Sequence, residues 1–126
     1  VNAWSCVNTA AQHAAIAALE GPQDAAAEMR EAFDERRRFL VDGLNRIDGV
    51  SCATPKGAFY AFPNISALGI DSKTLSSKIL EDAGIAVLAG SDFGIFGADY
   101  IRFSYANSLE NIDLALDRLS AFLGEL

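Results

Sequence analysis

Apolar residues recur at helical spacing along the first third of the chain. Residues 9–20 are almost entirely Ala, Ile and Leu, which are strong helix formers, and Gly21-Pro22 ends the run. Pro22 suits the first turn of a second helix, whose apolar stripe continues to Ile47. The pattern therefore predicts two helices, the second of them long enough to join one domain to another.

Two further helices are predicted downstream by their caps and their apolar stripes. Asp71 or Ser72 can cap a helix that Gly84 closes. Ser108 can cap the last helix, which carries its apolar stripe as far as Phe122. Both segments place apolar residues on one side, so each helix is expected to cover a core.

Four short segments between these helices have strand patterns. They are residues 50–53, 58–62, 85–89 and 100–105. The continuous apolar run at 85–89 predicts a strand buried on both faces. The order of elements predicts a two-layer α+β domain with a mixed sheet covered by helices, preceded by a long helix of the kind that joins domains.

Arg102 is the residue that most suggests a binding site. It lies in an alternating strand in which Ile101, Phe103 and Tyr105 share the opposite face. A guanidinium there can hold a carboxylate through two parallel hydrogen bonds, or it can form an internal ion pair or reach solvent from an edge strand. Gly57 and Phe59 also have two interpretations. Gly57 can allow close backbone approach and Phe59 can form an apolar pocket wall, or both residues only pack the strand against a helix.

Composition narrows the functional classes. The 126 residues include 10 Lys and Arg against 17 Asp and Glu, a net charge of -7, which disfavours nucleic acid as a partner. The apolar runs are too short for the ~20 residues of a membrane span. Cys6 and Cys52 match neither a disulfide framework nor a zinc site, so we expect a cytoplasmic protein without a metal.

The common catalytic sets are incomplete in this chain. His13, the only histidine, has no accompanying nucleophile motif, and the glycines form no phosphate-binding loop. The loop 90–94 could approach a ligand or merely turn the chain. The run Arg36-Arg37-Arg38 could bind an anion, but the neighbouring carboxylates favour a solvated charged face. We therefore assign no catalytic residue.

Taken in order, several motifs resemble the C-terminal portion of class I and II aminotransferases of the aspartate aminotransferase fold type. They include Gly21-Pro22-Gln23, Pro55-Lys56-Gly57-Ala58-Phe59-Tyr60-Ala61-Phe62-Pro63, Ala89-Gly90-Ser91-Asp92-Phe93-Gly94 and Tyr100-Ile101-Arg102-Phe103-Ser104-Tyr105-Ala106. The resemblance covers essentially the whole chain. It implies a single small domain over residues 1–126, with residues 1–21 leading in from a larger N-terminal domain.

The resemblance also implies roles for individual residues. Arg102 would bind the α-carboxylate of an amino acid or 2-oxo acid, and Gly57 and Phe59 would line the pocket. The cofactor would be pyridoxal 5'-phosphate (PLP), and the full-length enzyme would be a homodimer. The lysine that carries PLP in this family lies upstream of the matched region, so we expect the isolated chain to bind no PLP and to be inactive.

The start of the chain agrees with a fragment, since residue 1 is Val and the only methionine is Met29. Two alternatives remain open. One is another reaction on the same fold, such as β-elimination or decarboxylation. The other is a non-catalytic α+β binding or dimerisation domain in which Arg102 only forms an internal ion pair.

Overall fold

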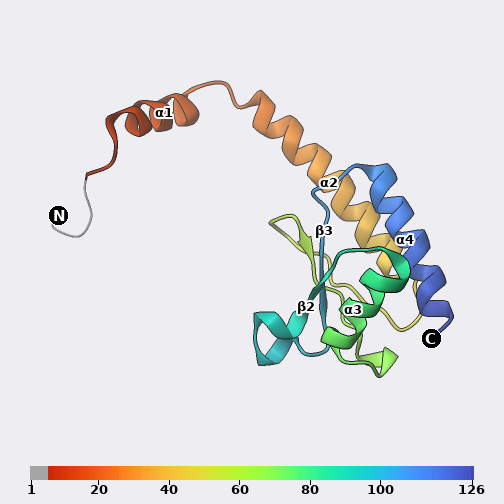
Figure 1. Ribbon diagram of the computed structural model, residues 1–126. Coiled ribbons are helices and arrows are strands. Elements are labelled where there is room, and N and C mark those ends of the chain that lie inside the picture. The colour runs from red at the N-terminus through yellow and green to blue at the C-terminus, as the bar shows by residue number, and fades with distance from the viewer. Residues whose placement is uncertain (1–5) are drawn as a thin grey trace. The chain divides into compact units, whose positions relative to one another are not determined.

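The computed structural model describes residues 6–126, which form four α-helices and a small three-stranded sheet (Figure 1). Residues 1–5 of the segment predicted to lead in from a larger domain lie outside the described residues. The chain divides into two compact units, Val1–Glu31 and Ala32–Leu126. The second unit contains the sheet and the candidate site.

The first unit contains helix α1 (Thr9–Glu20), which confirms the helix predicted over the Ala-rich segment. The side chain of Asn8 caps this helix by accepting a hydrogen bond from the Ala11 N–H at 3.3 Å. None of the residues of α1 is buried by this chain.

Helix α2 (Asp24–Leu44) has 21 residues and is shorter than the sequence predicts. It begins two residues after Pro22, and its final residues bury Leu40, Val41 and Leu44. Beyond Leu44 the Ile47 N–H donates to the Leu44 carbonyl at 3.2 Å, a tighter turn than an α-helix makes. The helix therefore ends before Ile47, although Ile47 itself is buried.

The sheet has the order β1-β3-β2, formed by β1 (Tyr60–Ala61), β2 (Leu88–Ala89) and β3 (Ile101–Ser104). The prediction of a mixed sheet is wrong, because both strand pairs are antiparallel. The crossover through helix α3 does give β1 and β2 the same direction. However, β3 lies between them, so these two parallel strands never pair.

The strands are also shorter than the sequence predicts. In the segment 50–53 only an isolated bridge from Ser51 to Asn64 forms. Before β1, Ala58 adopts a φ of 57°, which interrupts extended backbone. The segment 85–89 is not buried on both faces, since Leu88 is 45% exposed. Tertiary contacts, which local pattern does not report, set these limits.

The caps of the last two helices are the residues that the sequence predicts. Helix α3 (Ser72–Ala83) is capped by Asp71, whose side chain accepts from the Lys73 and Thr74 N–H groups, and it ends at Gly84 with a φ of 67°. Helix α4 (Leu109–Gly124) is capped by Ser108, whose hydroxyl accepts from the Asn111 N–H.

Helices α2, α3 and α4 pack against one face of the sheet, which confirms the two-layer α+β prediction. The core between the layers contains apolar side chains from all three helices and from the sheet. The sheet contributes Ala61, Ile101 and Phe103. The other face of the sheet is not covered by these helices, and it carries the candidate site.

Candidate functional site

Arg102 lies on the central strand, on the face of the sheet opposite the core. Its neighbours Ile101 and Phe103 are 1% and 6% exposed, whereas Arg102 is half-buried. The strand register places Leu88 directly across from Arg102 on the same open face. The structure therefore confirms the side of the strand that alternation predicts for this arginine.

Two aromatic rings enclose the guanidinium of Arg102. Its Cζ lies 4.3 Å from the ring centroid of Tyr60 and 4.4 Å from that of Phe93. Tyr60 belongs to β1, and Phe93 ends the short 3-10 helix Gly90–Phe93 that follows β2. Because β3 lies between β1 and β2, the two rings come from opposite sides of its strand. Each distance is within the range of a cation–π interaction.

No acidic side chain neutralises Arg102 in the part of the chain that the structure describes. The ion pairs there join Asp34 to Arg37 and Arg38, and Lys73 to Asp92. The Arg102 side chain also has no hydrogen bond among residues 6–126. A half-buried arginine that no carboxylate of its own chain neutralises can bind the carboxylate of a ligand.

Other aromatic side chains extend this surface to both sides of Arg102. Phe59 contacts Tyr60, with ring centroids 4.4 Å apart. On the other side, the Phe93 ring meets Phe62 edge-on at 6.1 Å. Phe59, Phe62 and Phe93 are 40%, 37% and 52% exposed, so the surface beside Arg102 is apolar and accessible in this chain.

Phe59 lies near Arg102, but Gly57 shows no steric constraint in this chain. The Phe59 ring contacts the Tyr60 ring, which lies against Arg102, and it also contacts the Phe33 ring of α2, with centroids 6.2 Å apart. Gly57 is exposed, and a Cβ added to it would meet no atom within 4 Å. The described chain therefore gives no packing reason for glycine at this position.

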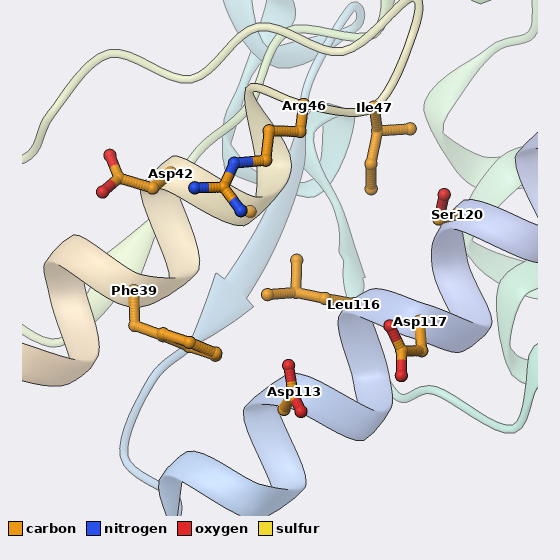
Figure 2. A pocket seen from close by; sticks show the side chains of 9 residues that line it. Phe39, Asp42, Arg46, Ile47, Asp113, Leu116, Asp117 and Ser120 are labelled. Atoms are coloured by element: carbon orange, nitrogen blue, oxygen red, sulfur yellow. The ribbon is translucent and has the colours of Figure 1, made fainter.

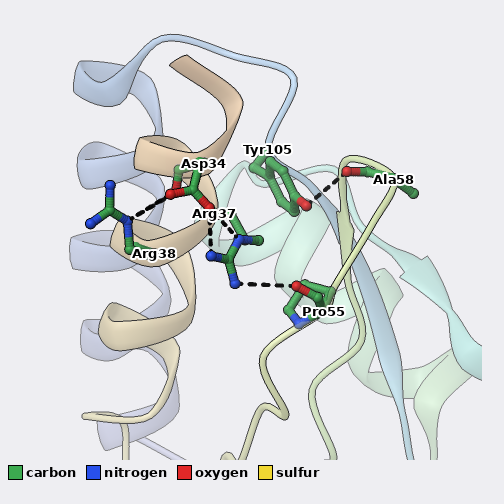
Figure 3. A network of polar contacts seen from close by, with 6 residues as sticks. All are labelled: Asp34, Arg37, Arg38, Pro55, Ala58 and Tyr105. Atoms are coloured by element: carbon green, nitrogen blue, oxygen red, sulfur yellow. Dashed lines mark hydrogen bonds and ion pairs between the residues drawn. The ribbon is translucent and has the colours of Figure 1, made fainter. Parts of the chain in front are cut away.

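A polar network holds the segment that carries Phe59 (Figure 3). Arg37 on α2 donates to the Pro55 carbonyl at 3.2 Å and to the Asp34 carboxylate. The Tyr105 hydroxyl donates to the Ala58 carbonyl at 2.9 Å. Arg37 thus links a helix to this segment, while Arg38 pairs with Asp34 at 3.1 Å on the solvated face that the sequence predicts.

The environment of Tyr105 changes its acidity. The residue is 1% exposed, and its backbone N–H donates to the Phe59 carbonyl at 2.9 Å. Burial raises the pKa of Tyr105 above its usual value, Arg37 lowers it, and Asp34 raises it. The phenol is therefore kept protonated as the hydrogen-bond donor that restrains the segment before β1.

A compact loop places Phe93 over Arg102. The Gly90 N–H donates to the Tyr100 carbonyl at 2.8 Å, and the Tyr100 N–H donates to the Gly97 carbonyl at 3.0 Å. Gly90 and Gly97 meet backbone to backbone, and both are buried. The buried hydroxyl of Ser72, at the start of α3, accepts from the Ser91 N–H at 3.3 Å.

Sequence reasoning missed Tyr60 and Phe93 as part of the site. Tyr60 directly follows Phe59, and Phe93 lies in a loop that could be a turn or a ligand contact. Only the strand order brings both rings to Arg102. The available signal was an aromatic residue close to a glycine, as Tyr60 is to Gly57 and Phe93 is to Gly94.

A separate pocket lies between α2 and α4 (Figure 2). Its volume is about 290 Å³, and its lining includes Phe39, Arg46 and Leu116, with three aspartates, Asp42, Asp113 and Asp117. It shares no residue with the surroundings of Arg102. Its acidic lining makes it a poor site for a carboxylate.

The three lysines lie at the surface of the described chain. Lys56, Lys73 and Lys78 are all exposed, and Lys73 pairs with Asp92 at 3.7 Å. None of the three lysines is therefore buried by the described residues. Within residues 6–126, no helix has the length and apolar character needed to cross a membrane.

The comparisons with known proteins agree on one family. Residues 1–119 match the family described as aminotransferase class I and II. The aspartate aminotransferase of Streptomyces avermitilis is 44% identical over 133 residues, covering 98% of this chain and 32% of that protein. The aspartate aminotransferase of Rhizobium meliloti is 41% identical over 129 residues, covering 94% of this chain and 31% of that protein.

A solved structure gives the same result. The alanine aminotransferase from Pyrococcus furiosus matches with a TM-score of 0.90 and 38% sequence identity, over 96% of this chain and 31% of that one. The chain thus spans about a third of the length of these relatives. Its sequence and its fold together show that the chain belongs to the class I and II aminotransferases.

Proposed function

We propose that this chain is the small, C-terminal domain of a PLP-dependent aminotransferase, which moves an amino group between an L-amino acid and a 2-oxo acid. Residues 1–126 would form one domain, with residues 1–21 leading in from the large domain. The family match and the coverage of about a third of each relative support this proposal. Aspartate and alanine, which the relatives' names contain, are the first donors to test.

The contribution of this chain is to bind the substrate carboxylate at Arg102. The observation that carries this role is a half-buried guanidinium without an acidic partner among residues 6–126, set in an exposed aromatic surface. A bidentate contact would fix both the charge and the orientation of a small acid. Phe59 would form part of the pocket wall, with Gly57 at its edge.

The remainder of the active site would come from outside this chain. The lysine that carries PLP in this family lies upstream of the matched region, so PLP would be held by the large domain, and the isolated chain would bind no PLP and be inactive. Ile95 and Phe96 are 85% and 89% exposed, which supports cover by the large domain or by a second subunit of a homodimer. We also propose a cytoplasmic location, supported by the two unpaired cysteines.

The test is Arg102→Ala in the complete enzyme. Loss of charge-assisted hydrogen bonds worth about 1.5–3 kcal/mol would lower kcat/KM by about 10- to 150-fold and raise KM. The PLP absorbance should not change, because Arg102 would contact the substrate and not the cofactor. Unchanged kinetics would reject the role. Turnover that needs no 2-oxo acid would indicate β-elimination or decarboxylation instead of transamination.

A further inference from the structure

The two rings that enclose Arg102 suggest a function beyond general packing. We propose that Tyr60 and Phe93 form an aromatic clamp that fixes the plane of the Arg102 guanidinium, so that a substrate carboxylate can approach it only along its edge. Both are then positioning residues that act through Arg102. This inference rests on the proposed function, because it assumes that Arg102 binds the carboxylate.

The contact distances support a clamp. The Arg102 Cζ is almost equally far from the two ring centroids, at 4.3 Å and 4.4 Å. One ring comes from β1 and the other from the 3-10 helix that follows β2, on opposite sides of β3. A guanidinium carries all its N–H donors in its own plane. In the proposed clamp the two rings cover the two faces of the guanidinium, which leaves these donors directed outward along the edge, where the two oxygens of a carboxylate can bind side by side.

Each ring has a contact besides Arg102 that holds it in place. Tyr60 is fixed by the β1–β3 register, in which it lies opposite Ser104. Phe93 is held from its other side by Phe62, which in turn stacks on Tyr100 with ring centroids 5.1 Å apart. The clamp is therefore formed before any substrate binds, and little ordering of Arg102 remains to be achieved on binding.

A clamp of this kind makes the planarity of Arg102 as important as its charge. Lysine at this position would keep a positive charge, but an ammonium group has no plane that the rings could orient. The two rings should therefore strengthen carboxylate binding only when the residue between them is an arginine. This dependence separates a clamp from residues that only support the fold.

The experiment measures carboxylate binding to the complete enzyme in a double-mutant cycle. Propionate, a carboxylate without an amino group, serves as the competitive inhibitor. Its Ki is measured for the wild type, Phe93→Leu, Arg102→Lys and the double variant. Phe93→Tyr keeps a ring at the position, and Phe39→Leu is the matched control, since Phe39 lines the separate pocket between α2 and α4 and has no ring contact among the described residues.

We expect Phe93→Leu to raise the Ki of propionate about two- to fivefold, the loss of one cation–π contact, with KM rising more than kcat falls. Phe93→Tyr and Phe39→Leu should keep the wild-type Ki. In the Arg102→Lys background, Phe93→Leu should change Ki less than about 1.5-fold, because no plane remains to be held.

Tyr60 gives an independent test of the same clamp. Tyr60→Phe should leave Ki unchanged, since the ring face makes the contact, whereas Tyr60→Leu should raise it about two- to fivefold. An equal effect of Phe93→Leu in both backgrounds, or an unchanged Ki in Phe93→Leu, would overturn the clamp. An unchanged Ki in Arg102→Lys and Arg102→Ala would instead reject the role of Arg102 itself, so the two failures are distinct.

Discussion

The crossing of Gly90 and Gly97 gives the sharpest test of how the loop is built. A Cβ added to Gly97 would lie 2.5 Å from the carbonyl carbon of Gly90 and closer still to its oxygen, whereas real Cβ contacts essentially never fall below 3.0 Å. The obstacle is backbone, so no side-chain rotation can relieve it. Gly97→Ala must therefore push the two segments apart.

The cost of this separation can be worked from the contacts that it strains. Overpacking against a rigid neighbour costs about 1–3 kcal/mol. Two hydrogen bonds join the same two segments. The Gly90 N–H donates to the Tyr100 carbonyl at 2.8 Å, and the Tyr100 N–H donates to the Gly97 carbonyl at 3.0 Å. Losing one of them adds about 1 kcal/mol. We expect Gly97→Ala to lower the free energy of unfolding by about 2–4 kcal/mol.

Urea denaturation of the 126-residue chain, followed by far-ultraviolet circular dichroism, measures this change. The matched control is Gly124→Ala at the end of α4, where an added Cβ meets nothing within 4 Å. It should be neutral or stabilise the chain by up to about 1 kcal/mol, because alanine favours a helix over glycine. A Gly97→Ala chain as stable as the wild type would refute the backbone-contact argument.

Two other predictions concern a buried hydroxyl and the two thiols. Tyr105→Phe removes the hydrogen bond from the buried hydroxyl to the backbone, and should lower the free energy of unfolding by about 1–2 kcal/mol at pH 8. Because burial raises the pKa of Tyr105 in the folded state, the wild type should lose stability as the pH rises above about 10, the unfolded value, and Tyr105→Phe should lose less over pH 9–11 in the same assay. If both chains have the same pH profile, the phenol does not titrate on unfolding. Cys6 is exposed, whereas Cys52 is buried and burial raises its pKa, so a thiol reagent at pH 8 should modify Cys6 quickly and Cys52 only on unfolding. Two equally fast thiols would contradict this order.

The elements that the sequence predicts best are those with local causes. Asp71, Gly84 and Ser108 mark helix boundaries because their own side chain or φ angle satisfies the helix end. Strand limits have no such local cause. The chain leaves the extended region at Ala58, where hydrogen bonds from Tyr105 hold the backbone from a distant part of the sequence. Residue patterns near Ala58 do not contain that information.

The same distinction applies to the candidate site. The open face of Arg102 follows from alternation along one strand, so local sequence predicts it. Its contacts with Tyr60 and Phe93 need the order β1-β3-β2, which is a property of the whole sheet. The mixed-sheet prediction was wrong for the same reason, because local sequence does not show that β3 lies between β1 and β2. The same strand order brings a ring to each side of Arg102.

The stability of the loop and the geometry of the site are therefore coupled through the chain itself. Phe93 lies three residues after Gly90, inside the segment that the Gly90–Gly97 contact closes. A change that opens this contact moves one half of the aromatic clamp while leaving Tyr60 in the sheet. The Gly90 N–H also holds the Tyr100 carbonyl directly before β3, so opening this contact should raise the Ki of propionate in the complete enzyme both through Phe93 and through the start of the strand that carries Arg102.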